Sequence, residues 1–172
     1  MDRATLEALY DQHAEPLFRY LSTMAHITDE ARDWLQDVFV KIARNGHCLE
    51  GVHHERAFLF RLARNVALDS LRRSKTRHHK LIELQHEARS VFAPASDPDN
   101  AAFRDQLGKA MAELPADQRD VVYLKLYEDL TFQAIAEILE ITGNTAASRY
   151  RYGLTKLRSS LRPLYDEIHE NL

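Results

Sequence analysis

The strongest constraint on the fold is that apolar residues recur at helical spacing along almost the whole chain. Leu6, Leu9, Leu17 and Leu21 illustrate the repeat near the start. Spacings of three and four residues place such side chains on one face of an α-helix, whereas a strand requires alternation of apolar and polar residues, and no such run occurs. The sequence therefore predicts an all-α fold. The expected helices cover residues 2–23, 28–45, 56–75, 102–114, 116–127, 131–139 and 142–161.

The helical repeat is interrupted once, between residues 77 and 100. This interval contains the sequence APASDPD at residues 93–99, and Pro, Ser and Asp in such density are typical of an exposed linker. The length of 172 residues fits two small domains. We expect a helical domain at residues 1–80, a flexible linker at 81–100 and a second helical domain at 101–172.

Proline and hydroxyl residues predict how several helices begin or end. Pro16 falls inside the first expected helix and should kink or break it. Thr28 or Asp29 suits the N-cap of the second helix, and Thr142 suits that of the last. Pro115 suits the first turn of the fifth helix.

Charge is concentrated in two basic segments. Residues 56–80 contain eight Lys or Arg against Asp69 alone, and residues 143–162 contain five with no acid. Because the whole chain has a net charge of −3, the remainder is strongly acidic, at −15. Two separate basic segments in an acidic chain indicate two polyanion contacts.

The first basic segment forms one face of its expected helix. On a helical wheel Arg61, Arg64, Asn65, Arg72 and Lys75 cluster opposite the apolar arc, with Phe58 and Leu68 among them. Guanidinium groups bind phosphate, and apolar groups stack on unpaired bases. A merely solvated basic face explains the pattern equally well.

The second basic segment has the proportions of a helix-turn-helix. A short helix at 131–139 is followed by the turn Glu140-Ile141 and a longer helix from residue 142. Its second helix presents short polar and cationic groups near its start, where major-groove readers contact bases. The residues concerned are Thr142, Asn144, Thr145, Ser148, Arg149, Arg151 and Tyr152.

Enzymatic and metal-binding functions find little support in the sequence. It contains no glycine-rich phosphate loop and no recognisable nucleophile constellation. His47, Cys48, His53 and His54 share one loop, but their spacing matches no standard zinc site, so we expect neither metal nor cofactor. A single cysteine and the absence of an uncharged membrane-spanning run favour a reducing, cytoplasmic location.

Four motifs in order resemble RNA polymerase sigma factors of the extracytoplasmic-function type. Residues 9–20 resemble the first helix of the family's second region, residues 29–39 (DEARDWLQDVF) its polymerase-binding helix, and residues 58–73 (FLFRLARNVALDSLRR) its minus-ten helix. Residues 114–161, with Leu114-Pro115, Gln118-Arg119 and the helix-turn-helix, are similar to region four. The resemblance covers nearly the whole chain.

The resemblance implies a role for each surface. Asp33, Gln36 and Asp37 would dock on the clamp helices of the polymerase largest subunit, while region four would meet the flap of the second subunit. The minus-ten promoter element would be held by Arg61, Arg64, Asn65, Arg72, Arg73 and Lys75 together with the loop at 46–55. The minus-thirty-five element would be read by the seven helix-turn-helix residues. Core RNA polymerase, promoter DNA and an anti-sigma protein are the partners implied.

Four positions depart from the family pattern, one of them Ala134, which replaces the common Glu of the short helix. Ala147 stands where many relatives carry Lys or Arg, and Trp34 replaces a usual Leu, so it belongs either to the core or to the polymerase contact. Glu140 stands where the turn usually has Gly, and this costs up to about 1 kcal/mol if the backbone needs positive φ. The alternative function is a helix-turn-helix regulator that binds DNA without docking on polymerase.

Overall fold

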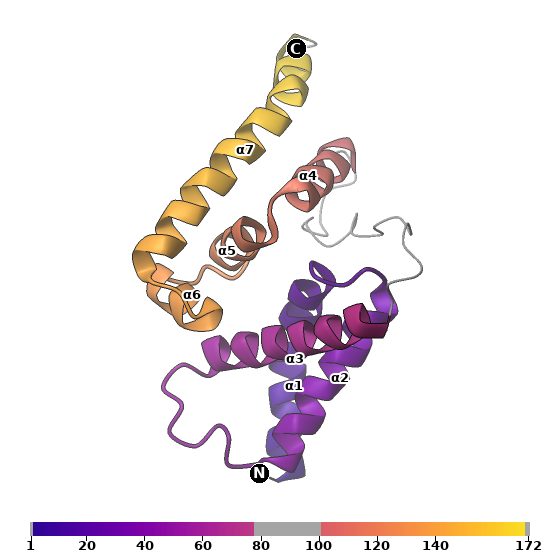
Figure 1. Ribbon diagram of the computed structural model, residues 1–172, viewed down its shortest axis with the longest axis vertical. Helices are drawn as coiled ribbons and strands as arrows, with labels where there is room; N and C mark the ends of the chain where they lie inside the picture. Colours follow the sequence, from indigo (N-terminus) through magenta and orange to yellow (C-terminus); the bar gives the residue numbers. More distant parts are fainter. Residues whose placement is uncertain (1, 78–100, 171–172) are drawn as a thin grey trace. The chain divides into compact units, whose positions relative to one another are not determined.

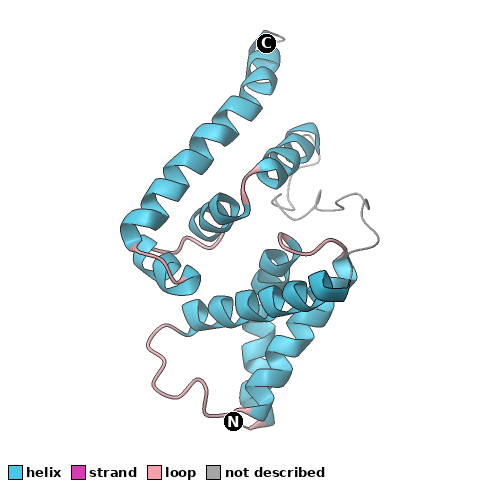
Figure 2. Ribbon diagram, in the orientation of Figure 1, coloured by secondary structure: helices cyan, strands magenta, loops and turns pink. Residues whose placement is uncertain are grey.

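The protein forms two compact helical units, Met1–Glu87 (unit 1) and Ala88–Leu172 (unit 2), in the computed structural model (Figure 1). The structure describes the backbone of residues 2–77 and 101–170, and side chains at 2–73 and 105–163. Every regular element in these ranges is an α-helix, which confirms the all-α prediction (Figure 2). The expected linker at 81–100 lies outside the described residues.

Unit 1 packs three helices around one core: α1 (Arg3–Ser22), α2 (Thr28–Arg44) and α3 (Glu55–Arg77). Leu17 and Leu21 of α1 are fully buried, as are Val38 of α2 and Leu59 of α3. The ring of Tyr20 packs edge-on against Phe60 at a centroid distance of 5.4 Å, joining α1 to α3. Trp34 is 3% exposed, so it belongs to this core and cannot form a polymerase contact.

Helix α1 continues through Pro16, so it does not break there, and the missing proline N–H costs the helix a single backbone bond. The expected N-cap of α2 was wrong. The N-cap of α2 is Ile27, which makes no side-chain cap bond, so neither Thr28 nor Asp29 has that role. The carboxylate of Glu30 instead accepts a hydrogen bond from the backbone N–H of His26 at 2.8 Å, tying down the chain just before the helix.

Unit 2 contains α4 (Ala101–Glu113), α5 (Ala116–Leu126), α6 (Phe132–Leu139) and α7 (Gly143–Glu170). Pro115 is the N-cap of α5, one position before the first turn that the sequence favoured. Its carbonyl accepts hydrogen bonds from the N–H groups of Gln118 and Arg119. Helix α7 runs past the predicted end at residue 161 and continues through Pro163.

Helices α5, α6 and α7 form the predicted helix-turn-helix and the helix that supports it. Ile135 and Ile138 of α6 are buried, together with Ala146 and Leu157 of α7. Helix α7 approaches α5 closely at Gly153, where an added Cβ would lie 2.6 Å from Cγ2 of Val122. The close approach fixes α7 against α5, and with it the outward face of the second helix.

The turn between α6 and α7 has the left-handed backbone expected of a glycine. Glu140 caps α6 at φ 56° and ψ 45°, a region that residues with a Cβ adopt at a cost. Its N–H donates to the carbonyl of Ala136. The condition under which Glu140 carries a backbone cost, a positive φ, is therefore met.

Candidate nucleic-acid interface

Helix α3 exposes most of the predicted minus-ten residues on one face. Arg61, Asn65, Arg72 and Arg73 are exposed, whereas Arg64 is half-buried. Lys75 lies within the helix, but its side chain is outside the described residues. The structure therefore brings four of these side chains to the solvent on the side opposite the core.

Contacts along α3 orient the cations of this face. The guanidinium of Arg72 lies 3.4 Å from the carboxylate of Asp69, and the Nε of Arg73 donates to the Asp69 backbone carbonyl at 3.1 Å. The guanidinium of Arg61 lies 5.9 Å from the ring centroid of half-buried Phe58. Because these contacts stay within one exposed helix, the arginines can be redirected to a polyanion at little cost.

Helix α2 carries the predicted polymerase residues on its exposed side. Asp33, Gln36 and Asp37 are all exposed, and Val40 continues the same stripe one turn later. The spacing of three and four residues places the four side chains on one helix face. The three predicted residues therefore form a continuous docking stripe.

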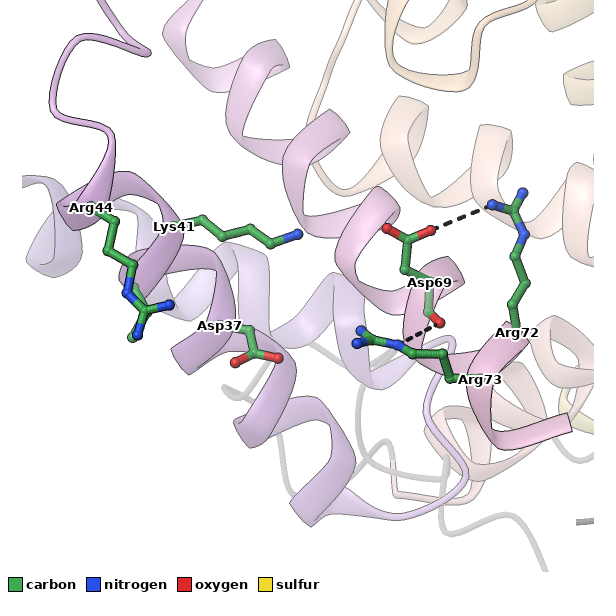
Figure 3. Close-up of a pocket in the computed structure, with 7 residues that line it drawn as sticks. Asp37, Lys41, Arg44, Asp69, Arg72 and Arg73 are labelled. Atoms are coloured by element: carbon green, nitrogen blue, oxygen red, sulfur yellow. Dashed lines mark hydrogen bonds and ion pairs between the residues drawn. The ribbon is translucent and has the colours of Figure 1, made fainter. Parts of the chain in front are cut away.

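Grooves flank this stripe on its two sides. One is lined by Gln36 with Arg32 and Leu35 of α2 and with Tyr10, Asp11, Ala14, Glu15 and Phe18 of α1. The other is lined by Asp37, Val40, Lys41 and Arg44 of α2 and by Asp69, Arg72 and Arg73 of α3 (Figure 3). Sequence reasoning missed Lys41 and Arg44, because they fall outside the basic segment of α3 and their position beside it depends on how α2 packs.

The start of α7 is held in place by its own polar side chains. The Oγ1 of Thr142 accepts from the N–H of Thr145 at 3.1 Å, which confirms the predicted cap, and it lies 2.8 Å from the Oγ1 of Thr145. Ser148 donates its hydroxyl to the Thr145 carbonyl at 3.0 Å. Asn144 is exposed one residue into the helix. The cap fixes the direction in which the first turn presents its N–H groups.

The predicted reader Arg149 points toward α5. Its Nε lies 3.1 Å from the carboxylate of Asp117 in the first turn of α5, and its side chain is 31% exposed. Gly153, which brings α7 close to α5, lies on the same side one turn later. Arg151 and Tyr152 are instead exposed, with the Arg151 guanidinium 5.7 Å from the Tyr152 ring centroid. The open face of α7 is therefore carried by Asn144, Arg151 and Tyr152, with Arg149 on its flank.

Two half-buried ionisable groups in unit 2 serve the fold. Arg119 donates from Nη2 to the carbonyls of Ala112 and Leu114, closing the corner between α4 and α5, and burial lowers its pKa. Burial raises the pKa of Tyr127 to about 12, and its ring stacks on Tyr123 at 5.0 Å. Both groups belong to the scaffold behind α7.

The loop between α2 and α3 is attached at its end. His13 of α1 lies 3.0 Å from the Glu55 carboxylate at the start of α3, and within the loop His47 lies 2.6 Å from Glu50. Cys48 is a half-buried free thiol. Among the residues that the structure describes, no three His, Cys, Asp or Glu side chains lie close enough to hold a metal ion. Helices in these ranges also include none long and apolar enough to cross a membrane.

Comparison with known families matches both units. The model for sigma-70 region 2 matches residues 9–77, and the model for sigma-70 region 4 matches residues 104–157. The first interval covers most of α1 and all of α2 and α3, and the second covers α5, α6 and the first half of α7. The two matches follow the same order as the motifs identified in the sequence.

Curated relatives match over almost their whole length. The chain is 28% identical over 165 residues to the ECF RNA polymerase sigma factor SigL of Mycobacterium tuberculosis, covering 95% of this chain and 92% of that protein. It is 24% identical over 172 residues to the ECF RNA polymerase sigma factor SigX of Bacillus subtilis, covering 97% and 89%. A similar fold occurs in the sigma factor RpoE from Bartonella quintana, solved in complex with the anti-sigma factor NepR. That likeness has a TM-score of 0.70 at 21% identity and covers 87% of this chain and 92% of that one.

Proposed function

The chain belongs to the extracytoplasmic-function group of the sigma-70 family, and we propose from this premise how its surfaces divide the work of transcription initiation. It binds core RNA polymerase and directs it to specific promoters. The observation that supports this function best is the order of regions 2 and 4 on two helical units, each with a basic surface on one helix. We place the domain boundaries at residues 1–80, 81–100 and 101–172.

Unit 1 binds polymerase and the minus-ten element with different helices. The exposed stripe of Asp33, Gln36 and Asp37 on α2 docks on the clamp helices of the polymerase largest subunit. The exposed face of α3 holds the separated strand, with arginines on phosphates and Asn65 available to a base edge. Capturing an unstacked base supplies the few kcal/mol that extrusion costs.

Unit 2 reads the minus-thirty-five element with the exposed side of α7. Asn144, Arg151 and Tyr152 are the side chains open to a major groove, where amide, guanidinium and aromatic groups recognise base edges and thymine methyls. Thr142, Thr145 and Ser148 order the first turn around its phosphate-facing N–H groups. Arg149, held by Asp117, sets the helix against α5 and borders the reading face.

The partners follow from this division of labour. They are core RNA polymerase, through the largest-subunit clamp helices and the flap of the second subunit, together with promoter DNA and an anti-sigma protein. The chain has no catalytic activity of its own and acts in the cytoplasm, where polymerase and promoters are found. Two modest DNA contacts on one chain gain affinity from each other through effective concentration.

Reconstitution with core polymerase tests the proposal. Transcripts that rise when the chain is overproduced supply candidate promoters, and fragments carrying them serve as templates for transcription with core polymerase alone or with the purified chain. We expect the chain to co-purify with core polymerase. Transcription should start at those fragments only when the chain is present. Failure to bind core polymerase would remove the sigma function.

A regulator that binds DNA without polymerase is not favoured. Such a protein needs only the helix-turn-helix, whereas region 2 of the family occupies residues 9–77 here. The same reconstitution separates the two functions. Specific, full-affinity promoter binding by the isolated chain would support the regulator.

A further inference from the structure

The groove between α2 and α3 joins cations from two helices at a place that the division of labour above leaves unassigned. It has a volume of about 530 Å³, and Lys41 and Arg44 line it from α2 while Arg72 and Arg73 line it from α3 (Figure 3). We propose that this groove binds the phosphate backbone of promoter DNA, and that Lys41 and Arg44 are DNA contacts. This inference rests on the sigma function proposed above.

The four cations line one groove although they come from two helices. All four side chains are exposed. Lys41 reaches from α2 toward α3, and the guanidinium of Arg73 extends from α3 back toward α2 (Figure 3). Favourable interaction with the dipole at a helix C-terminus explains why Lys41 and Arg44 occupy the last turn of α2. It does not explain why they share a groove with two arginines of another helix.

Carboxylates in the groove leave a net positive charge. Asp69 and Asp37 are the two acids among its lining residues. The Asp69 carboxylate lies 3.4 Å from the Arg72 guanidinium, and the Asp69 carbonyl accepts from Arg73, so this residue orients both arginines. Four cations against two acids give the groove a charge of +2, which suits an anionic partner such as consecutive phosphates and disfavours a neutral or basic one.

Continuity with the α3 face identifies the polyanion as DNA. Arg72 and Arg73 belong both to the groove and to the face that carries Arg61 and Asn65. A strand lying along that face would therefore pass into the groove, where Arg supplies bidentate forks and Lys a point charge. Val40, 42% exposed, lies among the lining residues on the α2 side and offers an apolar contact to a sugar. Helix α2 then has two functional sides, with Asp37 at the boundary between polymerase and DNA.

Salt dependence of promoter binding tests the assignment. The full chain carrying Lys41→Gln and Arg44→Gln is assembled with core polymerase, and its affinity for a promoter fragment from the overproduction experiment is measured over a range of salt concentrations. Loss of two phosphate contacts should reduce the steepness of log affinity against log salt by about 1.4 to 1.8. The control, Arg3→Gln with Arg19→Gln, removes the same charge from exposed sites on α1 and should leave the slope unchanged.

Neutral phosphates locate the contact on the DNA. Methylphosphonates are placed one at a time in the same fragment. Those facing the groove should weaken promoter binding by holoenzyme with the unsubstituted chain, but not by holoenzyme with the Lys41→Gln, Arg44→Gln chain. An unchanged slope with an active unsubstituted holoenzyme would overturn the groove assignment alone. Loss of core polymerase binding in the variant would overturn it too and assign the cations to polymerase. If the unsubstituted chain fails to bind core polymerase, the sigma function fails and the groove assignment falls with it.

Discussion

The two basic surfaces differ in how firmly their side chains are held. On α3 the ion pair of Arg72 with Asp69 and the contact of Arg61 with the Phe58 ring each lie within the one helix. On α7 the first turn is capped by Thr142, and Arg149 is tied to Asp117 of another helix. The α3 surface therefore suits a flexible separated strand, whereas the α7 surface suits a duplex of fixed shape, because pre-ordered groups lose less entropy on binding.

Unit 1 also differs from unit 2 in that the proposed polymerase and DNA surfaces lie side by side on α2 and α3. Asp37 borders a groove lined by four cations, so acidic and basic contacts meet within a few side chains. Unit 2 has a single open face on α7, supported from behind by α5. Substitutions in unit 1 should therefore separate recruitment from DNA opening, whereas those on the open face of α7 should weaken minus-thirty-five binding by degrees.

The largest effect is expected from charge reversal at Asp37. Asp37→Arg places a fifth cation in the groove and removes a carboxylate from the docking stripe, so core polymerase binding should weaken at least about thirtyfold, by roughly 2–5 kcal/mol. Co-purification with core polymerase measures this loss. Glu7→Arg makes the same charge change at an exposed site on α1 and serves as the control. Normal recruitment by Asp37→Arg would place Asp37 outside the interface.

Asn65→Ala should separate opening from recruitment within the same unit. Asn65 is exposed, so the free energy of unfolding should change by less than about 0.5 kcal/mol. Losing an amide contact to a base should cost roughly 1–3 kcal/mol, which corresponds to about fivefold to 150-fold in the formation of open promoter complexes. Permanganate reactivity of unpaired thymines measures opening, and core binding should be unchanged. A loss of core binding would show that α3 faces polymerase.

A smaller effect is expected at Asp117, which tests whether α7 is pre-ordered. The ion pair with Arg149 is partly exposed, so Asp117→Asn should cost only about 0.2–1 kcal/mol of stability. If Arg149 acts by positioning α7, then Asp117→Asn and Arg149→Ala should each weaken minus-thirty-five binding, and the double substitution should be no worse than Arg149→Ala alone. The affinities of the unsubstituted chain, the two single variants and the double variant for duplexes carrying the minus-thirty-five element complete this double-mutant cycle. Tighter binding by Asp117→Asn would show that Arg149 itself reaches DNA.

The fold could be predicted from sequence because it depends on periodic burial, while parts of the site depend on contacts between helices. The buried stripe of Val38 and Ile42 on α2 follows from spacing alone, as does the cap at Thr142. The pairing of Arg149 with Asp117 depends on how closely α7 approaches α5, and a helical wheel carries no such information. For the same reason, the sequence did not predict that Lys41 and Arg44 lie beside the basic residues of α3. Spacing predicted one helix over residues 2–23, but whether that helix would break at Pro16 depended on tertiary packing, which outweighs one lost hydrogen bond.

The smallest expected effect concerns the turn that joins α6 to α7. Glu140 has φ 56°, so Glu140→Gly should relieve backbone strain, offset in part by the greater freedom of glycine in the unfolded chain. We expect unit 2 to gain up to about 1 kcal/mol, seen as a higher denaturant midpoint at an unchanged m-value. Glu137→Gly, at an exposed position inside α6, is the matched control and should instead destabilise by about 1 kcal/mol. If Glu140→Gly also destabilises, the Glu140 side chain stabilises the turn by more than its backbone strain costs, and the order of α7 depends on that side chain as well as on its cap.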